Sequence, residues 1–363
     1  MKANDMTPQS ETELAQIIKD ASGPLRIKGG GTRPIGQTTG DALSTAKLSG
    51  ITLYEPGALT LVAQAGTPVE EIEKTLAAEN QRLAFEPMDH RTLLGTKGTP
   101  TIGGVVAANV SGPRRIAVGA CRDFMLGVRY VDGMGNIVKN GGRVMKNVTG
   151  YDLVKLMTGS YGTLGVLTEV SLKVLPAVET TATYTLTGLD DATAIKALSA
   201  ALSSPFEVTG AAHDPATATT SLRLEGFKAS VDYRADALSK HLEAFGTLSK
   251  AENNWAAIRD VTAFANQQGD VWRISVKPSD AAALAANLGA TAVQYDWGGG
   301  LIWAQAPTGH NLRGAMGDIA GHATLIRGTG QTFHPEPAPL AAISQGLRDR
   351  FDPRGILNTG IMS

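Results

Sequence analysis

The chain has 363 residues, of which 42% are hydrophobic and 18% are charged, a composition that favours two or three folded domains with sizeable cores. Lys and Arg total 33 and Asp and Glu total 34, so charge gives no reason to expect a nucleic-acid partner or an anionic membrane. The single cysteine, Cys121, excludes an internal disulfide, a cysteine-based zinc site and an iron–sulfur cluster held within this chain.

The N-terminus is polar and leads directly into a predicted helix. It lacks the basic and then apolar pattern of a signal peptide, and no window approaches the roughly 20 apolar residues of a membrane helix. We therefore expect a cytoplasmic protein without direct membrane insertion. Ser10 followed by Glu13 predicts the capped start of the helix, whose apolar face would comprise Leu14, Ile17 and Ile18.

Three consecutive glycines follow a short predicted strand in the stretch PLRIKGGGTRPIG, residues 24–36. Glycine reaches positive φ and allows the close approach of a ligand, and successive N–H groups can converge on a phosphate. The spacing matches neither the G-x-G-x-x-G of dinucleotide-binding folds nor the G-x-x-x-x-G-K-[ST] of phosphate-binding loops. Taken alone, the loop fits an anion cradle and an ordinary tight turn equally well.

Residues 52–83 predict two strands around a Pro-Gly turn, followed by a helix that Thr67 is expected to cap. The stretch from Pro87 to Gly112 is apolar enough to be buried, but it is too rich in glycine and small residues for a well-packed helix. Such a segment suits a backbone that lies against a flat ligand.

Alternating apolar residues predict a hairpin over residues 124–142 and a further strand over residues 163–176. Beyond about residue 178, Ala- and Thr-rich helical stretches alternate with strands, which indicates a separate α+β domain. The tail is predicted to form a helix that Pro353 stops, with an apolar face made of Leu340, Ile343, Leu347 and Phe351.

Four motifs, in this order, resemble the FAD-binding domain of the vanillyl-alcohol-oxidase type, or PCMH type, which FAD-linked D-lactate and glycolate dehydrogenases share. The first is KGGGTR, and the second is KGTPTIGGVVAANVSG, residues 97–112. The third, NVTGYDLVKLMTGSYGTLGVLTEV at residues 147–170, follows N-x-T-G-Y-D-L and G-S-E-G-T-L-G-[VI]-x-T-E. The fourth, FDPRGILNTG, is similar to the ending D-P-x-G-I-L-N-P-G, with Thr359 in place of the second proline.

The resemblance implies an α+β fold with three parts. A two-subdomain FAD-binding domain would occupy residues 1–177, and a smaller α+β cap domain would occupy residues 178–330. A C-terminal helix and tail, residues 331–363, would return to pack on the FAD-binding domain.

The resemblance also implies that FAD is bound without a covalent bond, because relatives with covalently linked FAD carry histidine where this chain has Thr32. The glycine loop would close on the diphosphate, and the second motif would line the isoalloxazine and the diphosphate. Tyr161 replaces the Glu of the third motif, so no role is carried over from that Glu. The residues that the resemblance assigns to FAD are Lys28, Gly29, Gly30, Gly31, Thr32, Arg33, Pro87, Gly98, Thr101, Gly103, Gly104, Ala108, Asn109, Ser111, Gly112, Gly119, Gly165, Val166 and Asn358.

Within this family the chain most resembles the smaller FAD-binding subunit of bacterial glycolate oxidase, on its length and on the stretches WRISVKP and DWGGGLIW. That resemblance implies two partners, a larger FAD-linked glycolate oxidase subunit and an iron–sulfur subunit. Any association with a membrane would come through these partners. Because one cysteine cannot hold a cluster, the iron–sulfur chemistry would belong to another polypeptide.

No residue stands out as catalytic, and no metal site is expected. Catalytic relatives carry H-x-G-D-G-N-x-H followed by Glu-His-Gly, whose histidines bind a divalent metal and take the hydroxyl proton, and none of the six histidines here lies in such a motif. His334 could face the flavin or contact backbone in a loop. Arg273 and Lys277 could hold a carboxylate or lie on a solvated strand edge, and Cys121 is expected to be a packed small residue.

Three functions stay open at this point. The chain could be the FAD-binding subunit of a glycolate oxidase complex, with glycolate oxidised at the larger flavin subunit and electrons passed to the iron–sulfur partner. It could instead be a free-standing FAD oxidoreductase of another 2-hydroxy acid or alcohol. It could also be a non-catalytic assembly subunit in which FAD is structural or absent.

Overall fold

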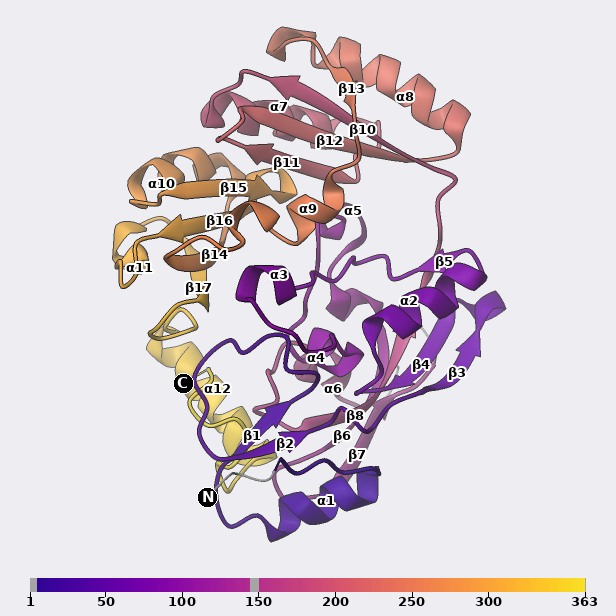
Figure 1. The fold of residues 1–363 in the computed structure, drawn as a ribbon, viewed down its shortest axis with the longest axis vertical. Coiled ribbons are helices and arrows are strands. Elements are labelled where there is room, and N and C mark those ends of the chain that lie inside the picture. The colour runs from indigo at the N-terminus through magenta and orange to yellow at the C-terminus, as the bar shows by residue number, and fades with distance from the viewer. Residues whose placement is uncertain (1–4, 144–149, 363) are drawn as a thin grey trace.

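The computed structural model describes residues 5–143 and 150–362, which form two large antiparallel sheets with helices packed against them (Figure 1). The fold class is therefore α+β, as predicted. The first sheet belongs to the N-terminal part of the chain, and the second sheet contains only strands that follow β9 (Leu175–Pro176). Residues 147–149 of the third motif lie outside the described residues.

Helix α1 (Glu11–Asp20) begins at the predicted cap, because the Ser10 hydroxyl accepts a hydrogen bond from the N–H of Glu13 at 3.1 Å. Its apolar residues share a core cluster with a small parallel pair of strands, β1 (Leu25–Lys28) and β2 (Asp41–Ser44). The glycine loop leaves β1 at its carboxyl end, as the sequence predicts.

The first large sheet has the strand order β3-β4-β8-β6-β7. Both predicted hairpins are confirmed, since β3 pairs with β4 across the Pro-Gly turn and β6 pairs with β7. The predicted cap of α2 is wrong: Pro68 occupies the cap position, and the Thr67 hydroxyl bonds instead to the backbone of Gly50 and Gln64. The elements are β3 (Ile51–Glu55), β4 (Thr60–Gln64), α2 (Val69–Ala78), β5 (Gln81–Arg82), β6 (Met125–Val131), β7 (Ile137–Gly141), α6 (Leu153–Met157) and β8 (Val166–Lys173).

The segment after residue 87 is more helical than predicted. Up to Gly112 it contains two short helices, α3 (Arg91–Leu94) and α4 (Ile102–Ala107), and α5 (Arg115–Val118) follows it. The prediction that no packed helix forms here is wrong for α4, because Ile102, Val105 and Val106 are buried. A small residue is needed at Gly103, where a Cβ would lie 2.7 Å from the carbonyl oxygen of Ala65.

The second large sheet has the strand order β13-β10-β12-β11-β15-β16-β14-β17, and helices α7, α8 and α10 bury apolar residues against it. Its strands are β10 (Thr180–Thr187), β11 (Gly210–Asp214), β12 (Thr219–Gly226), β13 (Ser249–Ala251), β14 (Asp270–Val276), β15 (Ala292–Asp296), β16 (Leu301–Ala306) and β17 (Gly321–Arg327). The helices of this part are α7 (Asp191–Ser203), α8 (Lys228–His241), α9 (Trp255–Arg259), α10 (Ala281–Asn287) and α11 (Leu312–Ala315).

Helix α12 (Ala338–Phe351) carries the chain from the second sheet back toward β1 (Figure 1). It ends before Pro353, as predicted, and the following residues bond to β1. The N–H of Leu25 donates to the carbonyl of Ile356 at 2.7 Å, and the N–H of Asn358 donates to the carbonyl of Leu25 at 2.9 Å.

The predicted apolar face of α12 is only half buried. Leu347 and Phe351 pack against the main core cluster, whereas Leu340 and Ile343 are 54% and 62% exposed. The helical spacing is therefore correct, but the first two turns of α12 cover no core.

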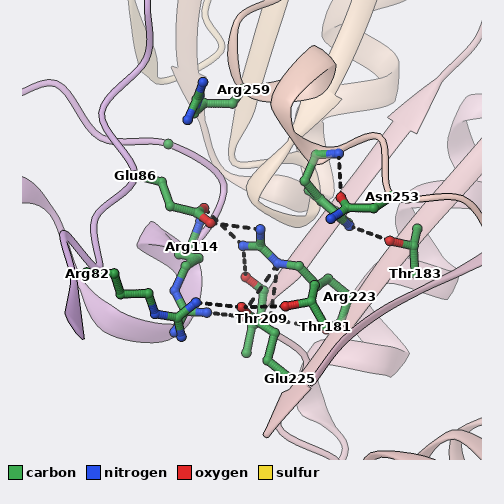
Figure 2. Close-up of polar contacts among 12 residues, drawn as sticks. Arg82, Glu86, Arg114, Thr181, Thr183, Thr209, Arg223, Glu225, Asn253 and Arg259 are labelled. Atoms are coloured by element: carbon green, nitrogen blue, oxygen red, sulfur yellow. Dashed lines mark hydrogen bonds and ion pairs between the residues drawn. The ribbon is translucent and has the colours of Figure 1, made fainter. Parts of the chain in front are cut away.

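A buried network of arginines and glutamates, which we call the interdomain ion network, joins the two parts of the chain (Figure 2). Arg223 on β12 donates two hydrogen bonds to the carboxylate of Glu86, at 2.9 and 3.0 Å. Glu225 on β12 accepts a hydrogen bond from Arg82 at 2.8 Å and forms an ion pair with Arg114. The side chains of Arg223 and Glu225 are only 3% exposed, so sliding one part over the other would leave buried charges unpaired.

Apolar packing reinforces this junction. The main core cluster combines Phe85 and Val106 of the N-terminal part with Phe264, Trp297 and Trp303 of the second part. In addition, the indole N–H of Trp297 donates to the carbonyl of Gly112 at 3.0 Å. The second sheet is therefore fixed over the α4 and α5 region of the N-terminal part.

We expect Arg223→Met to lower the free energy of unfolding by about 3 kcal/mol, because it removes a buried guanidinium and leaves the half-buried Glu86 carboxylate without this arginine. Urea unfolding followed by circular dichroism measures this change. Lys228→Met is the control, since the Lys228–Asp232 pair is 71% and 53% exposed and should contribute under about 1 kcal/mol. Equal losses in the two variants would contradict the role assigned to the network.

Candidate functional site

A cavity of about 620 Å³ lies in the N-terminal part of the chain, a size typical of cofactor sites. Its walls come from the glycine loop, the start of α4, the turn before β8 and the C-terminal tail. The predicted FAD residues that line it are Lys28, Gly29, Gly30, Gly31, Thr32, Arg33, Thr101, Gly103, Gly104, Gly165, Val166 and Asn358.

The glycine loop presents its backbone to this cavity. In the part of the chain that the structure describes, no N–H from Gly29 to Arg33 donates to a protein acceptor. Gly31 has a φ of 72°, which turns the backbone of the loop at a cost that only glycine avoids. Consecutive unpaired N–H groups of this kind form a concavity that suits a phosphate.

The three glycines do not all make room for a ligand. A Cβ on Gly30 would lie 1.6 Å from the carbonyl oxygen of Thr99, and a Cβ on Gly98 would lie 1.9 Å from the carbonyl oxygen of Gly30. Two backbone segments therefore cross in contact at this point. The missing side chain of Gly30 therefore makes room for the second loop.

At the start of α4, Thr101 lines the cavity with a hydroxyl group, and Gly104 lines it without a side chain. The Thr101 hydroxyl is buried and has no hydrogen-bond partner among the described residues, and Thr101 lines the cavity. A Cβ on Gly104 would meet only this hydroxyl, at 3.4 Å. An unpaired buried hydroxyl beside free N–H groups fits a ligand with phosphate oxygens, because buried polar groups are costly when unpaired.

The C-terminal tail closes the cavity through Asn358. The side-chain oxygen of Asn358 accepts a hydrogen bond from the N–H of Ile27 at 2.6 Å, and its side-chain amide nitrogen donates to the backbone carbonyl of Tyr161 at 2.7 Å. One side chain thus ties β1 to the turn before β8. The resemblance of FDPRGILNTG to the family ending was the only sequence signal for this role.

At the other side of the cavity, Arg33 lies over the ring of Tyr161, with its Cζ 5.2 Å from the ring centroid. His90, which also lines the cavity, is buried. Burial and the charge of Arg33 lower the pKa of His90 to about 3. The imidazole is therefore neutral at neutral pH and can act as both a hydrogen-bond donor and an acceptor.

The remaining predicted FAD residues lie outside the cavity lining, namely Pro87, Gly98, Ala108, Asn109, Ser111, Gly112 and Gly119. Several have structural contacts that explain the residue type. The side-chain oxygen of Asn109 accepts from the N–H of Arg122, and the Ser111 hydroxyl accepts from the N–H of Cys121. At Gly112 a Cβ would lie 2.3 Å from the carbonyl oxygen of Glu86.

The cavity also has lining residues that the sequence did not single out, including Met88, His90, Pro100, Val110, Gly162 and Ile361. His90 follows Pro87 closely in the chain, but a lone histidine in a loop gives no signal of its own. The apolar members share their residue types with the core, so composition could not separate them from it.

The structure shows the surroundings of His334, Arg273, Lys277 and Cys121, whose roles the sequence did not establish. The Nδ1 atom of His334 accepts a hydrogen bond from the N–H of Ala323 at 3.3 Å, which confirms backbone contact. Arg273 does not lie on a strand edge, because β14 pairs with β16 on one side and with β17 on the other. Lys277 is exposed beyond the end of β14. Cys121 is buried, and burial raises the pKa of its thiol, so the prediction of a packed residue is confirmed.

Comparison with known proteins connects this cavity to flavin binding. Residues 4–141 match the family model of an FAD binding domain. The chain is 35% identical over 357 residues to the glycolate oxidase subunit GlcE of Escherichia coli (strain K12), which covers 96% of this chain and 95% of that protein. It is 31% identical over 182 residues to the glycolate oxidase subunit GlcD of Bacillus subtilis (strain 168), covering 48% of this chain and 37% of that protein.

A solved structure of alkyldihydroxyacetonephosphate synthase has the same fold, with a TM-score of 0.71, 17% sequence identity, and coverage of 97% of this chain and 76% of that chain. The fold is thus that of PCMH-type flavoproteins, and the cofactor is FAD. The unpaired N–H groups of the glycine loop and the Thr101 hydroxyl fit the FAD diphosphate. No helix in residues 5–143 and 150–362 is long and apolar enough to span a bilayer.

We expect Gly104→Leu to weaken FAD binding by at least about tenfold, because the added side chain projects into the cavity and overlap of this kind costs about 1–3 kcal/mol. The FAD-free variant should not unfold more easily, since glycine is a poor helix former. Titration of the FAD-free protein with FAD, followed by flavin fluorescence, gives the Kd. Gly346→Leu in α12 is the matched control, because no atom lies within 4 Å of its Cβ position. Unchanged affinity in Gly104→Leu would contradict the assignment of the cavity.

Proposed function

Because the chain belongs to the family of the glycolate oxidase subunit GlcE, we propose that it is the FAD-binding subunit of a complex that oxidises glycolate to glyoxylate. The observation that carries this proposal is similarity along nearly the whole length of both proteins. The cavity supports it independently, because its backbone and hydroxyl donors suit a dinucleotide cofactor.

FAD is held without a covalent bond in this proposal. Thr32 stands where relatives with covalently linked FAD have histidine, and Cys121, the only cysteine, does not line the cavity. The loop from Lys28 to Arg33 and the Thr101 hydroxyl hold the diphosphate. When bound, FAD supplies a site that accepts two electrons.

The oxidation of glycolate takes place at a larger FAD-linked subunit in this proposal. The chain lacks the histidine motif that provides metal ligands and a proton acceptor in catalytic relatives, and each of those groups contributes several powers of ten in rate. Electrons then pass to an iron–sulfur cluster, which belongs to another subunit because the one buried cysteine of this chain cannot ligate a cluster. The chain works in the cytoplasm, and its partners provide any contact with a membrane.

The purified FAD-loaded chain should therefore release all its flavin on acid precipitation and should not be bleached by glycolate under anaerobic conditions. Absorbance of the flavin measures both outcomes. Adding the two partner subunits should restore glycolate-dependent reduction of a dye. Prompt bleaching of the isolated chain would contradict the proposal in favour of a free-standing oxidoreductase, and a colourless chain that still assembles would favour a structural subunit.

A further inference from the structure

Three arginines from distant parts of the sequence lie near one another at the junction of the two domains. Arg33 belongs to the glycine loop, Arg115 to α5 and Arg273 to β14. We call them the arginine cluster. In the described part of the chain, none of the three guanidinium groups donates a hydrogen bond or forms an ion pair. They differ in this from Arg82, Arg114 and Arg223, which are paired with glutamates in the interdomain ion network.

Aromatic rings are the partners of the arginine cluster. The Cζ of Arg115 lies 4.6 Å from the ring of Trp297, and the Cζ of Arg273 lies 5.0 Å from the same ring. Arg33 lies over Tyr161, which lines the cavity. A cation–π contact orients a guanidinium plane and compensates only part of the cost of removing its charge from water. The hydrogen-bonding edges of these guanidinium groups are left free for a ligand.

The electrostatics of the cluster favour an anion. Burial lowers the pKa of all three arginines, that of Arg273 to about 10, and the charges of Arg115 and Arg33 add to the effect on Arg273. Asp296 attracts Arg273, but burial raises the pKa of Asp296 to about 7, so this carboxyl is only partly ionised at neutral pH. Asp123 is the acid that acts on Arg115. A bound anion would therefore relieve repulsion between desolvated like charges.

Two histidines complete the surroundings without adding charge. Burial and the charge of Arg33 lower the pKa of His90 to about 3, so this imidazole is neutral at neutral pH. Desolvation and the charges of Arg273 and Arg115 lower the pKa of His322 as well. His90 lines the cavity, and Arg273 acts on the pKa of both histidines. A ligand bound by the arginine cluster would thus lie near imidazole groups that add no positive charge of their own.

We propose that the arginine cluster binds the carboxylate of a small 2-hydroxy or 2-oxo acid, which gives this chain a carboxylate site of its own next to the FAD cavity. The planar guanidinium fork matches a carboxylate with two parallel hydrogen bonds, which an ammonium cannot do. The choice of acid class rests on the proposed function, whereas the anion site rests on the unpaired arginines. The site needs both domains, because Arg273 and Trp297 belong to one and Arg33 and Arg115 to the other.

Isothermal titration of the purified FAD-loaded chain with sodium oxalate and sodium glycolate, at constant ionic strength, tests the proposal without requiring turnover. We expect saturable binding, accompanied by a change in the flavin absorption spectrum. Arg273→Met and Arg115→Met should each raise the Kd for oxalate by about tenfold or more, and Arg273→Lys should fall between Arg273→Met and the wild type. Lys277→Met is the control, since this exposed residue follows the same strand, and its Kd should stay within about twofold of the wild type.

FAD content and circular dichroism show whether each variant is folded, and two independent arginine variants keep the test open if one of them fails to fold. Absence of saturable oxalate binding to the FAD-loaded wild type would overturn the proposal. Equal binding of sodium sulfate would overturn the carboxylate class, and unchanged Kd values in both methionine variants would overturn the location. Failure of the proposed function is a separate result, since the partner subunits would then fail to restore glycolate-dependent reduction of the dye while oxalate binding persists.

Discussion

The structure depends on the interdomain ion network, in which the N-terminal part and the second sheet each supply charges that pair across the junction. Arg223 and Glu225 on β12 face Glu86, Arg82 and Arg114 in the N-terminal part (Figure 2). Such a network stabilises little compared with apolar packing, but it makes every displaced arrangement costly. It therefore selects one relative position of the two domains. That position brings Arg273 and Trp297 against Arg115 and the cavity.

The cavity itself depends on close contact between backbone segments. The glycine loop and the loop before α4 cross where Gly30 and Gly98 each lack a side chain, and this crossing orders both loops before any ligand binds. The unpaired N–H groups are thus held in place by packing rather than by hydrogen bonds among themselves. A preorganised cradle of this kind binds an anion with little ordering cost. The side chain of Asn358 orders a further part of the cavity, because it bonds to both β1 and the turn that contains Tyr161.

The sequence predicted local features well and non-local ones poorly. The cap at Ser10, both hairpins and the end of α12 follow from residue types within a few positions, so pattern alone sufficed. The cap of α2 was missed because the Thr67 hydroxyl bonds to the distant Gly50. The lining of the cavity by the glycine loop and Asn358 agrees with the family motifs, whereas the arginine cluster could not be predicted, because three segments far apart in sequence form it only after the second sheet docks.

Hydrogen–deuterium exchange tests most directly whether FAD occupies the cavity between the glycine loop and α4. Exchange of the FAD-free and FAD-loaded chain should be compared peptide by peptide. Exchange should be slower in the FAD-loaded chain at residues 29–33, where unpaired N–H groups would donate to the diphosphate, and at residues 101–107. Exchange at β10, β12 and β13, which lie away from the cavity, should be unchanged. Protection confined to the second sheet, with the glycine loop exchanging as fast as before, would show that FAD does not occupy this cavity.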